Sequence, residues 1–443
     1  MRFRKKLFEN VAFVLYINKI ILYNDTMSEI ITLSGGLRLA YQYIPHFHSV
    51  SLGVFVKVGS GNEIAADNGI AHFTEHVFFK GTEKRSAFDI VREMDSLGAN
   101  MNAYTTKEMT GFYFQCVDDA TDRCAEILSD LLLHSVFPPE ELEKERGVVI
   151  EEIGMVEDQP DDLSQDLCSS AFWGDYPYGL TILGTAANVK SFTSDDVRAF
   201  VARHYVSDNV VISIAGNISR DDAISLTERY FRFECRPADK RAFTLPAAFG
   251  GKVCAKYKNI EQANLTLAFP SISSIDDRMY ALAAMSVALG GGMSSLLFQE
   301  IRERLGLVYS VYDYSSLYEK AGAHCVYLGT NPKNLEKAVR AVMKTVGEFA
   351  ERGLDEETLH RAKMQVKSSL ILGGESSMSI MRAQGKAALM MNEAFDLDER
   401  IAKVERLRKE EINELVRTIF LSKQIGVGYV GKDVGFDLTE IYK

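Results

Sequence analysis

The stretch His72-Phe-Thr-Glu75-His76 decides how the rest of this 443-residue chain is interpreted. On a helix, His72 and His76 lie one turn apart on the same face, and Glu75 borders that face. Two neutral imidazoles at this spacing can hold one Zn²⁺ ion at about 2.0–2.1 Å, and a carboxylate beside it can take a proton from a water that the ion activates. The motif therefore indicates a hydrolytic metal site. The alternative is a helix with two ordinary surface or core histidines.

A third ligand is offered by a long helix predicted over residues 138–158. Prolines open this segment, glutamates suit its positive N-terminal end, and apolar residues recur along one face. The segment carries Glu145 and Glu152, which are seven residues apart and therefore two turns apart on one face. If Glu152 binds the metal, Glu145 lies close enough to support the site. The alternative for two glutamates on a Glu-rich helix is a solvated charged face.

The motif, its flanks and the later glutamate together resemble the zinc signature of the pitrilysin and mitochondrial processing peptidase family. The flanking stretches Gly69-Ile-Ala-His-Phe and Phe79-Lys-Gly-Thr82 match that family, as does the spacing of 76 residues between His76 and Glu152. The order H-x-x-E-H is that of the inverted zinc peptidases. The resemblance implies three zinc ligands (His72, His76 and Glu152), a catalytic base (Glu75) and a supporting carboxylate (Glu145).

Length and composition fit a globular protein of two or three domains. Apolar residues make up 47% of the chain, enough for full hydrophobic cores. The formal net charge is −11, and residues 1–26, with five basic and two acidic side chains, carry +3, which leaves −14 for the rest of the chain. This negative charge argues against nucleic-acid binding and favours cationic or neutral binding partners.

Cysteine usage and the first residues bear on location. Six cysteines without a C-x-x-C pair are typical of reduced, mostly buried thiols, and we expect a cytoplasmic, bacterial protein. Residues 1–26 begin basic and turn apolar, as signal sequences do, but Asn18 and Lys19 interrupt the apolar run and no small-residue cleavage site follows. A weak leader, a disordered extension and a start codon placed too far upstream remain open; Met27, directly before the first family-like strand, favours the last. No apolar run approaches the roughly 18 residues of a membrane-spanning helix.

The predicted elements occur twice in a similar order. In the first half we predict a strand that begins at Ile30 and ends before the turn at Gly35-Gly36, followed by strands at 37–43, 50–58, 101–106, 111–117 and 210–216. Helices are predicted at the zinc motif and at 86–98, 120–134, 138–158 and 194–204. Part of this order recurs in the second half. Strands are predicted there at 263–269 and 322–328, and helices at 333–352 and 355–372. An alignment of the two long helices at an offset of 216 residues places Arg361 and Ser368 where the first half has its two glutamates. Only the first half can therefore hold the metal.

These patterns predict an α+β protein of two homologous domains that form a clamshell, each an antiparallel sheet with helices packed on one side. We divide the chain into an N-terminal extension (1–29), a zinc-binding catalytic domain (30–239), a linker (240–251) and a substrate-holding domain without zinc (252–443).

The most distinctive stretch of the second half runs from Leu289 to Tyr309. Its three successive glycines precede a helix, but it lacks the Lys-Ser/Thr of a phosphate-binding loop, so nucleotide binding is not expected. The family resemblance implies that Arg302 and Tyr309, seven residues apart, help to hold the substrate and stabilise the oxyanion. The alternative for Arg302 is a surface ion pair with Glu300 or Glu303.

Two further segments resemble substrate-binding elements of the family. The stretch 98–106 resembles its edge strand, on which a peptide lies as an added strand, with Asn102 and Ala103 at the contact; the alternative is an ordinary hairpin. Asp162 and Asp166 lie ten and fourteen residues after Glu152, the separations at which processing peptidases carry carboxylates that engage an arginine near the cleavage site. Pro160 departs from that pattern, and the alternative is a solvated loop or helix start.

The sequence thus predicts a zinc metalloendopeptidase of the single-chain bacterial processing-peptidase type that cleaves extended peptides or presequence-like segments. Mitochondrial relatives divide the zinc site and the arginine–tyrosine pair between two different subunits, whereas this chain carries both, which implies a homodimer. The alternative function is a non-catalytic peptide-binding or scaffold subunit. Such relatives lose zinc ligands, and here none is missing.

Overall fold

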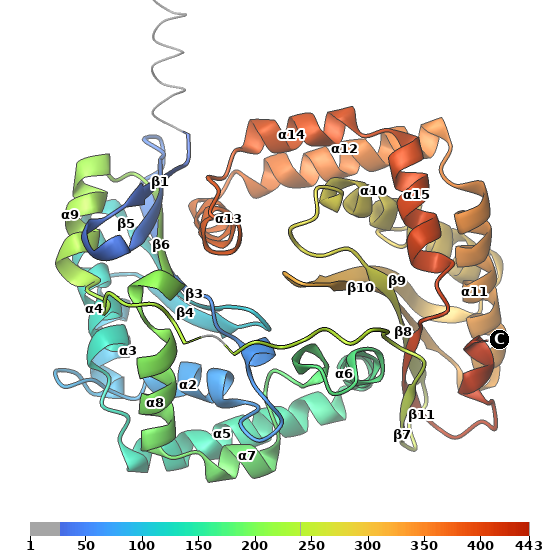
Figure 1. The fold of residues 1–443 in the computed structure, drawn as a ribbon, viewed down its shortest axis with the longest axis horizontal. Helices are drawn as coiled ribbons and strands as arrows, with labels where there is room; N and C mark the ends of the chain where they lie inside the picture. The colour runs from blue at the N-terminus through green and yellow to red at the C-terminus, as the bar shows by residue number, and fades with distance from the viewer. Residues whose placement is uncertain (1–26, 240, 443) are drawn as a thin grey trace, which may run out of the picture.

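Two β-sheets organise the computed structural model, which describes residues 27–239 and 241–442 (Figure 1). The first sheet has the strand order β1-β2-β6-β3-β5-β4 and the second the order β7-β11-β8-β10-β9. The first comprises β1 (Glu29–Thr32), β2 (Arg38–Tyr43), β3 (Ser49–Val56), β4 (Asn100–Thr105), β5 (Thr110–Val117) and β6 (Val210–Gly216). The second comprises β7 (Val253–Tyr257), β8 (Ala263–Ser271), β9 (Val308–Leu317), β10 (Gly322–Thr330) and β11 (Gly426–Gly431).

The helices fall into two similar sets. The first half contains α2 (Ile70–Phe78), α3 (Ala87–Ser96), α4 (Thr121–His134), α5 (Pro139–Asp158), α6 (Pro160–Trp173), α7 (Ala186–Ser191), α8 (Ser194–His204) and α9 (Arg220–Tyr230). The second contains α10 (Met279–Leu289), a π-helix (Phe298–Arg304), α11 (Leu335–Arg352), α12 (Glu356–Gly373), α13 (Ser377–Met390), α14 (Leu397–Arg406) and α15 (Lys409–Phe420). Serine 86 caps α3 as predicted, whereas α8 is capped by Thr193 rather than by Ser194. None of the described helices is long and apolar enough to cross a membrane.

The α+β class and the two related halves are confirmed, with one correction to the strand directions. Apart from β1, the order β2-β6-β3-β5-β4 matches β7-β11-β8-β10-β9 strand for strand. In each sheet one pair is parallel, β2 with β6 and β7 with β11, so the sheets are mixed rather than purely antiparallel. Helices α2 to α8 lie between β2 and β6 in the chain, and α10 to α15 lie between β7 and β11, which gives each parallel pair the long crossover that it requires.

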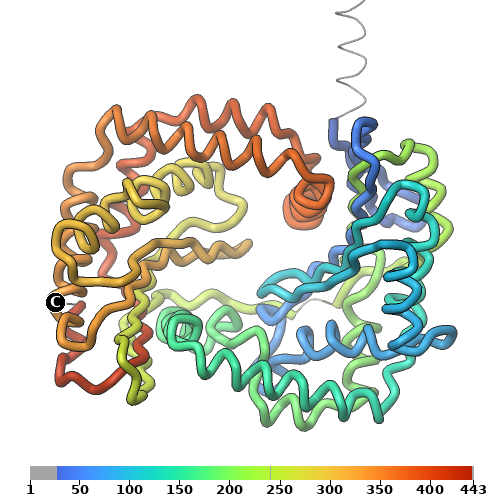
Figure 2. The backbone as a smooth tube through the Cα atoms, turned by 180° about the vertical axis from the view of Figure 1, so that it is seen from behind, coloured from blue at the N-terminus to red at the C-terminus, as the bar shows by residue number. Residues whose placement is uncertain are grey.

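The prediction that helices pack on only one side of each sheet is wrong. Helix α6 of the first half lies across β8 and β11 of the second sheet, and α13 of the second half lies across β3 and β6 of the first, as both views show (Figures 1 and 2). Hydrogen bonds join the layers: Ser164 and Thr266 hydroxyls are 2.9 Å apart, and Gln384 Nε2 donates to the Ile214 carbonyl at 2.7 Å. The halves exchange these helices because both faces of the central strands are apolar and must be covered.

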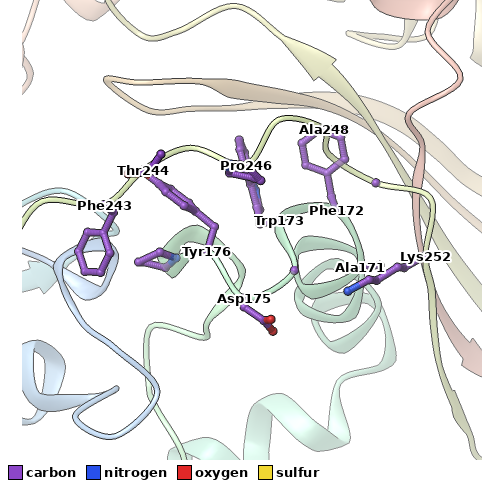
Figure 3. A pocket seen from close by; sticks show the side chains of 13 residues that line it. Ala171, Phe172, Trp173, Asp175, Tyr176, Phe243, Thr244, Pro246, Ala248 and Lys252 are labelled. Atoms are coloured by element: carbon purple, nitrogen blue, oxygen red, sulfur yellow. The ribbon is translucent and has the colours of Figure 1, made fainter.

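The segment that joins the halves is held by aromatic packing. Phe172 stacks on Phe249 with ring centroids 5.5 Å apart, and Trp173 meets the same ring edge-on at 4.9 Å. Tyr176 contacts Phe243. The side chains of Phe172, Trp173, Tyr176 and Phe243 line a cavity of about 420 Å³ between the end of α6 and the joining segment (Figure 3). The segment is thereby fixed to α6, and the domain boundary at 240–251 stays a prediction.

We predict that the contact between α6 and the second sheet tolerates no added methyl group. A Cβ on Gly428 would lie 2.0 Å from the Ser164 carbonyl oxygen and 2.4 Å from the Cys168 backbone nitrogen, so Gly428→Ala must push α6 away from β11. We expect the free energy of unfolding in urea to fall by about 1–3 kcal/mol. The control is Gly147→Ala in α5, where nothing lies within 4 Å of the added Cβ; it should be neutral or stabilising by up to about 1 kcal/mol. Equal effects of the two changes would contradict the packing described.

Candidate metal centre

The helix that carries the motif is held firmly at its N-terminus. Helix α2 is almost wholly buried, and Gly69 before it has a φ of 101°, a conformation that favours glycine. The buried Glu63 carboxylate accepts hydrogen bonds from the backbone N–H groups of Gly69 and Ala71, at 2.7 and 2.8 Å, and from the Asn68 side chain at 2.9 Å. Glu63 thus satisfies N–H groups of the first turn and offsets the helix dipole. Sequence reasoning missed it, because it lies too far before the helix to match a capping pattern.

Three donor groups meet at one corner of α2 and α5. Glu152 Oε2 lies 3.6 Å from His72 Nε2 and 3.6 Å from His76 Nε2. Within the described chain, these three residues form the one group of His, Cys, Asp or Glu side chains whose ligand atoms all lie within 4.8 Å of one another. The structure therefore brings together the three residues that the sequence proposes as ligands.

The donor set fits a zinc ion. Ligand atoms about 2.1 Å from a tetrahedral ion are about 3.4 Å from each other, close to the two separations of 3.6 Å. Glu152 Oε2 is buried without a hydrogen-bond partner in the structure, as expected of a group that awaits a cation. Burial lowers the pKa of His72 to about 3, so this imidazole is neutral and its nitrogen can coordinate.

A second carboxylate orients one of the imidazoles. Glu145 Oε1 lies 2.8 Å from His76 Nδ1, and Glu145 Oε2 lies 2.5 Å from the Lys80 ammonium. Since a carboxylate only accepts, His76 Nδ1 carries the proton and Nε2 presents its lone pair towards Glu152. Glu145 thus stands where a supporting carboxylate is expected, and Lys80, one turn beyond His76, is a contact that the sequence analysis missed.

Glu75 is placed beside the three donors but is not one of them. Its carboxylate accepts a hydrogen bond from the Thr105 hydroxyl on the edge strand β4. Burial raises the pKa of the Glu75 carboxyl above its ordinary value, which brings it nearer to the range suited to proton transfer at neutral pH. The Glu75 carboxylate is thus held in place beside the three donor groups, and its raised pKa makes it a better acceptor of a proton from a water molecule.

The donors open into a cavity of about 510 Å³. Ala103 on β4 lines it, and so do Asp162 and Asp166, one turn apart on α6, while Asn102 beside Ala103 is exposed outside it. Pro160 is the first residue of α6 rather than a break in it, so this acidic stretch is helical.

Lys107 is a further cavity residue that sequence reasoning missed. Burial lowers the pKa of its ammonium to about 8, while the nearby Asp166 carboxylate acts in the opposite direction. The ammonium donates to the Leu180 carbonyl. A single lysine in a hairpin turn gives no sequence signal, since only the fold brings it to the aspartates.

Arg302 and Tyr309 lie in the second half, and neither is among the residues that line this cavity. Arg302 is exposed, with its guanidinium 4.9 Å from the Phe298 ring, and Tyr309 is 59% exposed. Glu300 pairs with Arg304 rather than with Arg302, so the alternative of a surface ion pair with Glu300 is not what the structure shows. Among the described residues neither the Arg302 guanidinium nor the Tyr309 hydroxyl takes part in an ion pair.

Family models and relatives agree with this architecture. A model described as "Insulinase (Peptidase family M16)" matches residues 38–186, and one described as "Peptidase M16 inactive domain" matches residues 191–366. The zinc protease YmxG of Bacillus subtilis is 38% identical, over 88% of this chain and 95% of that protein. A zinc protease of Streptomyces coelicolor is 33% identical, over 90% and 88%.

Solved structures share the fold. A peptidase M16 inactive domain from Pseudomonas fluorescens has a TM-score of 0.86 at 20% identity, and the match covers 92% of this chain and 98% of that one. A protease from Helicobacter pylori has a TM-score of 0.81 at 21% identity, covering 92% and 99%. The fold and the three-donor cluster are those of a zinc protease-like protein. The chain belongs to peptidase family M16, and Zn²⁺ is its cofactor.

The buried cap of α2 predicts a pH dependence. Burial raises the pKa of Glu63 to about 7, above its ordinary value of 4.5, so the folded protein holds this proton more tightly than the unfolded chain. The protonated Glu63 carboxyl therefore contributes to the stability of the fold fully below about pH 4.5, and this contribution is lost as pH rises through about 7. In metal-free protein, we expect the melting temperature of the wild type to fall relative to that of Glu63→Gln between about pH 5 and about pH 8. A difference that does not change with pH would contradict this prediction.

Proposed function

We propose that this protein is a zinc metalloendopeptidase that hydrolyses extended peptides or presequence-like segments. The observation that carries the proposal is the meeting of His72, His76 and Glu152 at one corner, with the buried Glu75 carboxylate beside them. His72, His76 and Glu152 would hold the ion. Zn²⁺, when bound, supplies a Lewis acid that polarises a peptide carbonyl and makes a water molecule more acidic.

The chain's own residues supply the remaining chemistry. Glu75 takes the proton of the attacking water and later gives it to the leaving amine, and the Thr105 hydroxyl holds the carboxylate in place for both transfers. Glu145 keeps His76 in the tautomer that leaves Nε2 free. The attack creates negative charge on the carbonyl oxygen, and this charge needs hydrogen-bond donors at a fixed position.

The edge strand β4 offers a place for the substrate backbone. Among the described strands, β4 pairs with β5 alone, so its outer edge is unpaired within them. Ala103 lies on this strand and lines the cavity. The Ala103 N–H donates to the side chain of its own neighbour, Asn102, at 2.8 Å, so it does not take part in the ladder with β5. An extended peptide that displaces the Asn102 side chain can take over this N–H as an added strand.

We propose that a second copy of the chain completes the site. Arg302 and Tyr309 lie outside the cavity of their own chain, and both are exposed. In a homodimer, the zinc half of one subunit would face the Arg302–Tyr309 half of its partner, and these two side chains would donate hydrogen bonds to the carbonyl oxygen as its charge develops.

The first prediction separates the ligand from the base. Glu75→Gln should keep zinc bound but lower kcat by at least about a hundredfold, because the proton acceptor is lost. His76→Ala should lose both zinc and activity, whereas His134→Ala, an exposed histidine, should lose neither. Zinc content by atomic spectroscopy and cleavage of an unstructured peptide measure the two properties. Near wild-type turnover in Glu75→Gln would exclude the assigned base, and an intact zinc content with no peptidase activity in the wild type would favour a peptide-binding scaffold.

The second prediction concerns assembly. Glu75→Gln chains and Arg302→Ala/Tyr309→Phe chains should each be inactive alone. A mixture that exchanges subunits should regain activity, because one of the two composite sites in each heterodimer is intact. Each variant mixed with itself is the control. Absence of recovery after verified exchange, or a fully active monomer, would refute the shared site.

The third prediction concerns specificity for arginine. Asp162 and Asp166 face one cavity from one helix, so they can bind a guanidinium by charge-assisted bonds worth roughly 1.5–3 kcal/mol, a ten- to hundredfold preference for Arg over Ala. Asp162→Asn/Asp166→Asn should reduce this ratio of kcat/KM, measured with paired peptides that differ two residues before the scissile bond. Asp161→Asn, next to the pair but outside the cavity lining, is the matched control. An unchanged ratio in the double variant would show that these aspartates do not read the substrate.

A further inference from the structure

The second half contains a cavity of about 470 Å³ that belongs to no site described above. Three elements build it, namely helix α10, the edge strand β9 and helix α12. Its lining includes Met279, Tyr280, Ala283, Ser315, Leu317 and Ser369. The cavity therefore lies at the open edge of the second sheet, on the side that α10 covers.

This cavity is the counterpart of the metal cavity in the first half. Strand β9 is the edge strand of the second sheet, at the position that β4 occupies in the first. Helix α12 corresponds to α5 when the two halves are aligned at an offset of 216 residues. In each hairpin the last ladder pair before the turn includes a cavity residue, Thr105 with Thr110 and Leu317 with Gly322. Ala103, two residues before Thr105, lines the metal cavity, and Ser315, two residues before Leu317, lines the cavity of the second half. The fold has thus kept a cavity at the second position while its metal-binding residues are absent there.

The lining selects against charged ligands. Among the described residues that line this cavity none is charged, and the surfaces are aliphatic carbon, the Met279 thioether, the Tyr280 ring and three serine hydroxyls. An ion that entered would lose water without gaining a partner of opposite charge. A flat aromatic ring, by contrast, can contact the thioether and the tyrosine ring favourably.

The Ser315 hydroxyl in this cavity is oriented by a buried histidine and a buried aspartate. Ser315 Oγ lies 2.9 Å from His324 Nδ1, and His324 Nε2 lies 2.9 Å from Asp313 Oδ2, although the angle of the second contact is too poor for a regular hydrogen bond. The His324 and Asp313 side chains are fully buried. Because the carboxylate attracts the proton to Nε2, Nδ1 accepts from the Ser315 hydroxyl, whose oxygen lone pairs then face the cavity. Ser315 is thus set to accept a hydrogen bond from a ligand.

We propose that this cavity binds an uncharged aromatic molecule that carries one N–H or O–H donor. The aromatic body fills the space between α10 and α12, and its donor meets Ser315. A cavity of this volume, mostly apolar with a few placed polar groups, has the character of a small-molecule site.

The test uses the zinc-loaded protein and two probes of the same shape, indole with an N–H and benzothiophene without one. Calorimetric or NMR titration should give saturable binding of both, with indole about five- to tenfold tighter. Ser315→Ala should remove that difference and leave benzothiophene unchanged. Ser316→Ala, on the opposite face of the same strand, is the matched control and should preserve the difference.

Filling the cavity tests its location. Ala283→Phe on α10 should abolish binding of both probes. If that variant folds poorly, Ser369→Phe on the exposed face of α12 should do the same. Equal affinity of the two probes in the wild type, or full binding in a filled variant that folds, would overturn the proposal. Activity plays no part in these readouts, so their outcome is independent of the proposed peptidase function.

Discussion

The packing of α5 against α2 is the constraint on which the candidate site depends. Leu142 and Val149 of α5 are buried in the core. Each is followed three residues later by a glutamate, Glu145 and Glu152, and the buried contacts therefore direct both carboxylates towards the imidazoles. The result is a chain of contacts in which a lysine holds a carboxylate and the carboxylate holds His76. A rigid corner of this kind keeps three donors close together before any ion arrives, which lowers the cost of binding it.

The local part of this arrangement could be predicted because periodicity fixes which residues share a helix face. Spacings of four and seven residues place His72 with His76, and Glu145 with Glu152, on one face of their helices. The family resemblance then implies that the two helices share one metal site. Glu63 and Lys107 could not be predicted, since each reaches its partners through a loop whose path is set by the whole domain. Nor could the exchange of α6 and α13, because an apolar strand pattern shows that a face is covered but not by which half.

The two halves show how one topology carries two chemistries. Apart from β1, their sheets match strand for strand. Yet Arg361 and Ser368 lie on α12 where α5 has its glutamates, and both are exposed. The histidine helix α2 corresponds to α10, which is apolar and buried along most of its length. The second half thus keeps the framework of a metal cavity without donors, in accord with its match to a domain described as inactive.

The central claim is that one zinc ion binds to His72, His76 and Glu152, in the first half only. The most direct measurement is anomalous diffraction at the zinc absorption edge from crystals grown with Zn²⁺. We expect one peak per chain, about 2.0–2.2 Å from Nε2 of both histidines and from the Glu152 carboxylate. No peak at this corner, or a stronger peak in the second half, would contradict it.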